Sequence, residues 1–160
     1  MSSISMNPRG KYFEEFHIGQ RIISAGRTIT EADIVNFAGI SGDFNQMHVD
    51  ADYSKNSAFG QRVAHGLLVL SVISGLAVQT GVMEGTVIAF REVSEWKFAK
   101  PVYIGDTVNA ELEVKEVKEF RRIGGGSVTI EVDVKNQNGD TVMKGNWVVL
   151  IKSRSTSESM

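Results

Sequence analysis

The segment from Gly66 to Gly81 constrains the fold of this chain most strongly. Its residues are apolar on almost every face of a helix, and helices of this kind are buried rather than lying on a surface. The apolar run is broken by two serines and Gly75 and is too short to span a membrane. Because glycine in a helix interior costs about 1 kcal/mol relative to alanine, we expect sheet backbone or a ligand to approach Gly75 closely. The segment therefore predicts a buried central helix.

Four long segments after Gly81 are rich in Val, Ile, Thr, Phe and Trp, which is typical of strands. Residues 111–114 and 128–134 alternate between apolar and polar side chains, as half-buried antiparallel strands do. Glycine-rich and Asn-Gly turns separate the segments. The predicted strands are residues 86–100, 106–119, 127–136 and 141–152, with a first strand over residues 20–29. This order predicts an α+β fold in which an antiparallel sheet wraps around a long central helix.

Two shorter helices are predicted between the first strand and the buried helix. Thr30 is a suitable N-cap, and Asp33 follows three residues later as its capping-box partner. Apolar side chains recur on one face of this helix, and Gly39 and Gly42 are expected to end it. Asp50 is a second N-cap and predicts a short helix over residues 51–57.

Composition excludes several classes of protein. The chain has 160 residues, a formal net charge of −2 and no cysteine. Well-spread charges argue against nucleic acid and membranes as partners, and the absence of cysteine excludes disulfides and thiolate metal sites. The first residues have no apolar signal-peptide core, so a soluble, cytoplasmic protein is expected. We expect residues 1–160 to form a single domain with flexible tails at residues 1–9 and 153–160.

The residues suited to acid–base chemistry cluster just before the buried helix. Asp43, Asn45 and His48 lie on a predicted loop, and His65 directly precedes the helix. Each has a structural explanation as well, since Asp43 could close an Asx turn and His65 could hold a loop carbonyl. Asp43, His48, Asp50 and His65 could bind a metal ion by residue type, but their spacing matches no common zinc pattern. We therefore expect no metal.

Two motifs carry a resemblance to a known family. Residues 42–50 read GDFNQMHVD and residues 64–68 read AHGLL, which resembles the signature of MaoC-like (R)-specific enoyl-CoA hydratases, proteins with the hotdog fold. Residues 98–108, FAKPVYIGDTV, look like the later strand–turn–strand motif of that family. Gln46 stands where the family usually has proline, and residues 61–62 read QR where an Arg-Pro pair is common.

The resemblance implies hydration of trans-2-enoyl-CoA to (R)-3-hydroxyacyl-CoA, or the reverse dehydration, on an acyl-CoA thioester without metal or organic cofactor. Asp43 and His48 are residue types that can activate water and protonate the α-carbon, and the resemblance implies that both hold one catalytic water. Gly66 begins the buried helix, where a free N–H can approach the thioester oxygen. The supporting residues implied are Asn45, which would orient the loop or His48, the structural His65, and Ser74, which would line the site.

Two other functions stay open at this point. A hotdog acyl-CoA thioesterase would also use a carboxylate to activate water, and a non-catalytic acyl-CoA-binding subunit would bind the same ligand without turnover. Lys100, Arg121 and Arg122 are candidates for the phosphates of coenzyme A, although a solvated basic face explains them as well. Residues 124–126 are three glycines that predict a flexible hairpin, because no helix and no lysine follow as in a phosphate loop.

A homodimer or higher homo-oligomer is also expected. A sheet of about five strands around one helix leaves an exposed edge, and sheet edges are usually paired or covered. Hotdog proteins typically pair two sheets in a dimer, so the resemblance implies a substrate tunnel lined by both protomers.

Overall fold

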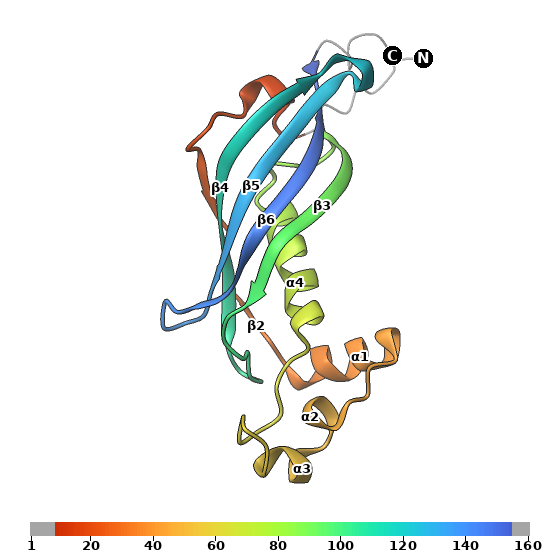
Figure 1. The fold of residues 1–160 in the computed structure, drawn as a ribbon, viewed down its shortest axis with the longest axis vertical. Coiled ribbons are helices and arrows are strands. Elements are labelled where there is room, and N and C mark those ends of the chain that lie inside the picture. The colour runs from red at the N-terminus through yellow and green to blue at the C-terminus, as the bar shows by residue number, and fades with distance from the viewer. Residues whose placement is uncertain (1–8, 155–160) are drawn as a thin grey trace, which may run out of the picture.

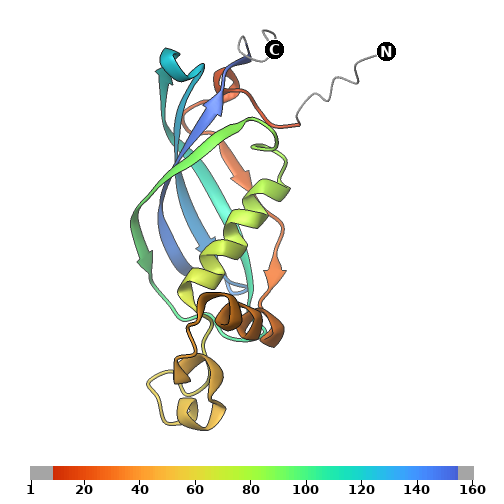
Figure 2. The same ribbon diagram turned by 90° about the vertical axis from the view of Figure 1, so that its right-hand side faces the viewer.

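The computed structural model describes residues 9–154 and shows a curved antiparallel sheet with one long helix on its concave face (Figures 1 and 2). The helix is α4 (Gly66–Gln79). The strands in their order across the sheet are β1 (Arg21–Ile23), β4 (Thr107–Phe120), β5 (Gly125–Lys135), β6 (Thr141–Lys152) and β3 (Val87–Phe98), and β2 (Arg27–Thr28) pairs with β4. The predicted α+β arrangement and the four long strands are confirmed.

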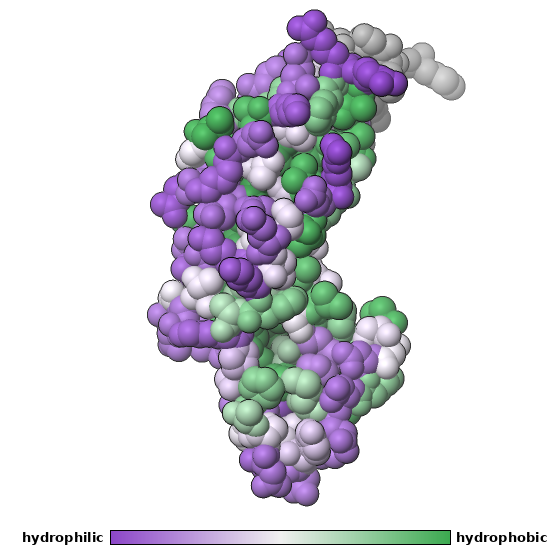
Figure 3. All heavy atoms as spheres, viewed as in Figure 1, coloured by the Kyte–Doolittle hydropathy of each residue, from purple (hydrophilic) through white to green (hydrophobic). Residues whose placement is uncertain are grey.

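The core lies between α4 and the inner face of the sheet. Val114 on β4 is paired with Ile130 on β5, which is paired in turn with Trp147 on β6, and all three side chains are buried. Val69 and Ile73 of α4 are fully buried in the same cluster, and burying each such side chain stabilises the fold by about 1.5–3 kcal/mol. The outer face of the sheet is largely hydrophilic (Figure 3), which explains the alternation in the sequence.

The prediction that α4 is buried on every side is wrong for this chain. Leu67 is 61% exposed and Val78 is 49% exposed. A Cβ atom added at Gly75 would meet nothing within 4 Å, so among residues 9–154 neither the sheet nor any other segment lies against this glycine. The sheet covers only one side of the helix, and its other side faces outward (Figure 2).

Three helices gather beyond one end of the sheet, below α4 in Figure 1: α1 (Glu31–Ser41), α2 (Gln46–Val49) and α3 (Ala51–Lys55). The capping box of α1 is confirmed, because the Thr30 hydroxyl accepts from the Asp33 amide and the Asp33 carboxylate accepts from the Thr30 amide. The helix continues through Gly39 and ends at Gly42, whose φ of 77° is left-handed and favours glycine. Asp50 caps α3 as predicted, 2.9 Å from the Tyr53 amide.

Two other expectations are corrected by the structure. The predicted first strand is split into β1 and β2, because the backbone and hydroxyl of Ser24 between them bond with the backbone of Ala110. The glycine run follows a short 3-10 turn, η2 (Arg121–Ile123), and its last two members begin β5. A Cβ at Gly126 would collide with the ring of Phe13, in the turn η1 (Phe13–Glu15). Close packing, rather than flexibility, therefore requires glycine there.

The predicted flexible tails fall largely outside residues 9–154. At their inner ends, Arg9 forms an ion pair with Glu84, and the Ser153 amide donates to the carbonyl of Gly124. Among the helices of residues 9–154, none is both long enough and apolar enough to cross a membrane.

Candidate active site

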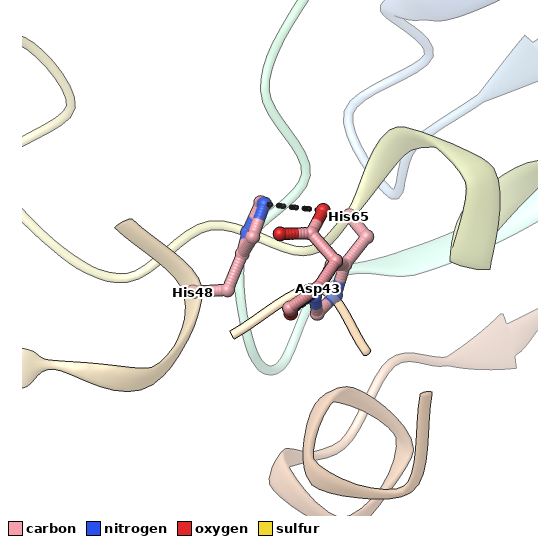
Figure 4. A group of neighbouring side chains, drawn as sticks. All are labelled: Asp43, His48 and His65. Carbon is pink, nitrogen blue, oxygen red and sulfur yellow. Dashed lines mark hydrogen bonds and ion pairs between the residues drawn. The ribbon is translucent and has the colours of Figure 1, made fainter. Parts of the chain in front are cut away.

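Asp43 lies directly after the glycine that ends α1. Its amide donates to the Ser41 hydroxyl at 3.1 Å, and its Oδ1 atom accepts from the Asn45 amide at 3.2 Å. The side chain therefore closes an Asx turn, which fixes one carboxylate oxygen and leaves Oδ2 directed toward His48 (Figure 4). Because the side chain is about half exposed, at 51%, solvent and small molecules can reach it.

His48 lies on the short helix α2 rather than on a loop, which the sequence did not predict. Asn45 is the N-cap of this helix, with its Oδ1 atom 3.4 Å from the Met47 amide. The His48 side chain is 9% exposed, and its Nδ1 atom lies 2.7 Å from the carbonyl of Val63. A carbonyl only accepts, so Nδ1 carries a proton, and in the neutral ring Nε2 presents a lone pair. That Nε2 atom lies 3.9 Å from Oδ2 of Asp43 (Figure 4).

His65 holds the two other residues in place. Its Nε2 atom donates to the backbone carbonyl of Asp43 at 2.9 Å, and its ring stacks on that of His48 at a centroid distance of 3.8 Å. The ring of Phe37 on α1 also contacts the His65 ring, at a centroid distance of 5.0 Å. The His65 side chain thus binds a loop carbonyl and fixes the plane of the His48 ring.

Gly66 opens α4 beside these residues. The N-cap residue, His65, makes no side-chain capping bond among the described residues, so the first amides of α4 are left for a ligand in a region where the helix dipole favours negative charge. The ring of Phe98 lies against Gly66, and an added Cβ would stand 2.6 Å from it. Only glycine leaves room for both this ring and a closely approaching oxygen.

A pocket of about 650 Å³ adjoins His48 and Gly66. Its walls are mostly apolar and include Leu67 and Phe98, and Lys100 is the one cation among its described lining residues. The Lys100 ammonium group lies 2.9 Å from the carboxylate of Asp140. Of the three cations considered from the sequence, Lys100 therefore lies at the site, whereas the turn with Arg121 and Arg122 lies at the opposite end of the sheet (Figure 1).

Within one chain, Ser74 does not lie beside Asp43, His48 and Gly66. It lies on the exposed side of α4, where its hydroxyl donates to the Ser71 carbonyl at 2.8 Å. It is not among the residues that line the pocket beside His48. Its predicted place in the site therefore stays a prediction that would need a second chain.

The geometry also bears on metal binding. Ligand-type atoms of Asp43, His48 and His65 all lie within 4.8 Å of one another, whereas Asp50 is used as a helix cap. The two imidazoles are stacked at an interplanar angle of 26°. Nearly parallel rings direct their in-plane lone pairs side by side, rather than toward one ion at about 2.1 Å from each nitrogen. The arrangement therefore favours acid–base chemistry.

Sequence reasoning missed one residue of this region. Arg62 donates from Nε to the backbone carbonyl of His48 at 2.7 Å and from Nη1 to the carboxylate of Glu31 at 2.5 Å. In the sequence, Arg62 stood out only as part of the QR pair at residues 61–62, where the family commonly has Arg-Pro.

Comparisons with known proteins place the chain in a family. The model of the MaoC-like domain matches residues 15–136. Protein MaoC of Klebsiella aerogenes is 43% identical over 69% of this chain, which spans about a third (32%) of that protein's length. An (R)-specific enoyl-CoA hydratase of Rhodospirillum rubrum is 34% identical over 89% of this chain and 93% of its own.

Solved structures agree with this assignment. The R-hydratase PhaJ1 of Pseudomonas aeruginosa is 32% identical, with a TM-score of 0.75 over 89% of this chain and 86% of its own. A double-hotdog protein of Mycobacterium tuberculosis superimposes with a TM-score of 0.80 over 92% of this chain and 46% of its own at 18% identity, which shows the fold alone. The chain therefore belongs to the MaoC-like family, which includes enoyl-CoA hydratases and dehydratases, and it has their hotdog fold.

Proposed function

We propose that this protein hydrates trans-2-enoyl-CoA thioesters to (R)-3-hydroxyacyl-CoA, or catalyses the reverse dehydration. One observation carries the proposal: the Oδ2 atom of Asp43 and the lone-pair Nε2 of His48 face each other at 3.9 Å, beside the first amides of α4. Relatives that are named as (R)-specific hydratases and as a 3-hydroxybutyryl-CoA dehydratase support this class of reaction.

When the His48 ring is neutral, the two facing atoms are both hydrogen-bond acceptors, so they do not bond to each other. A water molecule about 2.8 Å from each could donate one O–H to each of them. One of the pair removes a proton as the water oxygen attacks the β-carbon, and the C=C electrons move onto the thioester oxygen as an enolate. A proton then adds to the α-carbon, so that one water is added in total.

The enolate oxygen requires a donor while it carries charge. The Gly66 amide is suitable because it begins a 14-residue helix and has no side chain to block approach. Such a donor is worth about 3 kcal/mol of transition-state stabilisation in enzymes where one was removed. The apolar walls of the adjoining pocket would hold the acyl chain, and Lys100 would meet the negative charge of coenzyme A.

The expected homodimer belongs to the same proposal. Strand β3 pairs only with β6 among the described strands, so its other edge is unpaired over 12 residues. Its side chains Ile88, Phe90 and Val93 are 40–50% exposed, and an edge of this length and character is normally paired or covered. A second copy paired along β3 would also cover the open side of α4. The cytoplasmic location stays a prediction.

A substrate panel tests the proposed function. The purified protein is given trans-2-enoyl-CoA thioesters of short, medium and long chain, and hydration is read as loss of conjugated absorbance. The product is then offered to dehydrogenases specific for (R)- and (S)-3-hydroxyacyl-CoA. We expect turnover with (R) product only. Thiol release from saturated acyl-CoA without hydration would identify a thioesterase instead, and binding without any turnover would identify an acyl-CoA-binding subunit.

A further inference from the structure

The helix that carries His48 is too short to be stable without contacts from other segments. Helix α2 has only four residues, and isolated helices this short are unstable in water. Its last carbonyls need partners from outside the helix. The carbonyl of Met47 accepts from the Val63 amide at 3.1 Å, and the carbonyl of His48 accepts from Arg62 Nε at 2.7 Å. The position of His48 therefore depends on the segment that contains Arg62.

Arg62 connects this helix to a second element. A second guanidinium nitrogen of Arg62, Nη1, donates to the carboxylate of Glu31 at 2.5 Å. The Arg62 side chain is only 13% exposed. Glu31 is the first residue of α1, which is 11 residues, or about 16 Å, long. Asp43 follows the other end of the same helix. The guanidinium group thus joins the helix that leads to Asp43 and the helix that carries His48.

From these contacts we infer that Arg62 is a positioning residue, which sets the separation of Asp43 and His48 by bracing α1 against α2. The inference rests on the proposed function for its catalytic consequence, but the bracing itself is a property of the two helices. A planar guanidinium bonds both partners at once in a fixed geometry, which a lysine cannot reproduce. The Arg62 bonds also hold the Val63 carbonyl in position to accept from His48 Nδ1, because Val63 directly follows Arg62 in the chain.

Two variants and a matched control separate bracing from general stability. Arg62→Met keeps the length of the side chain but removes both bonds, and Arg62→Lys keeps the charge with one bond at most. Arg21→Met is the control, because Arg21 pairs with Glu111 at the edge of the sheet and is 64% exposed. Misplacing a catalytic group by about 1 Å can cost about a hundredfold in rate. We expect kcat to fall about tenfold to a hundredfold in Arg62→Met with KM changed less than about twofold, less in Arg62→Lys, and not in Arg21→Met.

The deciding readout does not require activity. The chain has three histidines. A His17→Ala variant identifies the imidazole ¹⁵N signals of His17, and correlation of each remaining ring with its assigned backbone amide separates His48 from His65. We expect His48 in the wild type to show the single Nδ1–H tautomer, and in Arg62→Met an average of both tautomers while the melting temperature stays within a few degrees. An unchanged His48 signal in Arg62→Met would overturn the inference, as would wild-type kcat in that variant. If the wild type itself does not hydrate any enoyl-CoA, the proposed function fails, and the His48 signal still decides whether Arg62 braces the helices.

Discussion

The Nε2 atom of His48 lies 3.9 Å from the Oδ2 atom of Asp43, and the second polar atom of each side chain is bound elsewhere. His48 Nδ1 donates to the Val63 carbonyl, and Asp43 Oδ1 accepts from the Asn45 amide. Each residue therefore presents one acceptor atom to the other in a fixed direction. This preorganisation distinguishes the pair from a surface ion pair, whose two partners would be free to rotate.

Replacing Gly66 by alanine tests the role of the start of α4. The new Cβ would stand 2.6 Å from the Phe98 ring, so the ring must move into the space beside the helix start. Phe98 is 54% exposed and can move, so we expect little loss of stability but a fall of about tenfold in kcat/KM for enoyl-CoA. The double variant Gly66→Ala/Phe98→Ala should recover part of this loss, because the two residues are in contact. Strictly additive effects would contradict the account.

Replacing Lys100 by glutamine tests the contact with coenzyme A. An exposed charge pair is worth at most about 1 kcal/mol, so we expect KM for enoyl-CoA to rise up to about fivefold with kcat unchanged. The matching pantetheine thioester, which lacks the nucleotide phosphates, should show no difference between variant and wild type. Lys115→Gln is the control, since Lys115 is exposed on β4 outside this pocket. An equal rise in KM for both substrates would show that Lys100 does not meet the phosphates.

Replacing Phe90 by aspartate tests the proposed dimer. Phe90 is half exposed on the unpaired edge strand and contacts the edge of the Trp147 ring. An aspartate buried in the proposed dimer interface would oppose pairing of the two β3 strands. We therefore expect the wild type to sediment as a dimer and Phe90→Asp as a monomer at micromolar concentration. Ile23→Asp is a matched control, because Ile23 is also exposed, at 64%, but lies on β1 at the other edge. A monomeric wild type would contradict this prediction.

Asp33 gives a prediction about pH and stability. Burial opposes ionisation of Asp33, but bonds from the Thr30 backbone and hydroxyl and the charge of Arg27 outweigh it and hold the pKa of this carboxyl below its usual value. A pKa lowered by folding contributes stability that is present above the unfolded pKa and is lost as the pH falls through the folded pKa. Asp33→Asn should therefore lower the free energy of unfolding by about 1 kcal/mol at neutral pH, or about 2–4 °C in melting temperature.

The difference between Asp33→Asn and the wild type should begin to shrink as the pH falls below about 4, the pKa of aspartate in the unfolded chain, and should be lost as the pH falls through the lower pKa of the folded state. Asp52→Asn serves as the control, because the Asp52 side chain is 94% exposed and pairs only with Lys55 among the described ion pairs. A difference in stability that is the same at pH 7 and at low pH would contradict the account.

Local patterns predicted much of the fold, because each depends on neighbouring residues. Alternating side chains located β4 and β5, and the Thr30–Asp33 pair located the start of α1. The exposed side of α4 was not predictable, because the apolar pattern gives the side chains that favour burial and not the segments that cover them. The four-residue helix α2 was missed because its partners, Arg62 and Val63, are distant in sequence.

The site could be predicted as a set of residue types but not as a geometry. The sequence indicated Asp43, His48 and Gly66, yet it did not show that His65 stacks on His48. It also gave Asp43 two alternative explanations, a turn or catalysis. In the structure the two explanations are compatible, because the Asx turn engages Oδ1 and leaves Oδ2 directed toward His48.

The most direct test of the central claim is the hydration rate of crotonyl-CoA in Asp43→Asn, measured beside the wild type and His17→Ala. His17 is exposed and outside the site, and asparagine retains the acceptor of the Asx turn while removing the negative charge of the carboxylate. A placed general acid or base contributes about a hundredfold to ten-thousandfold. We therefore predict a fall of at least a hundredfold in kcat for Asp43→Asn with an unchanged melting temperature, and wild-type rates for His17→Ala. A folded Asp43→Asn variant that hydrates crotonyl-CoA at the wild-type rate would contradict the account.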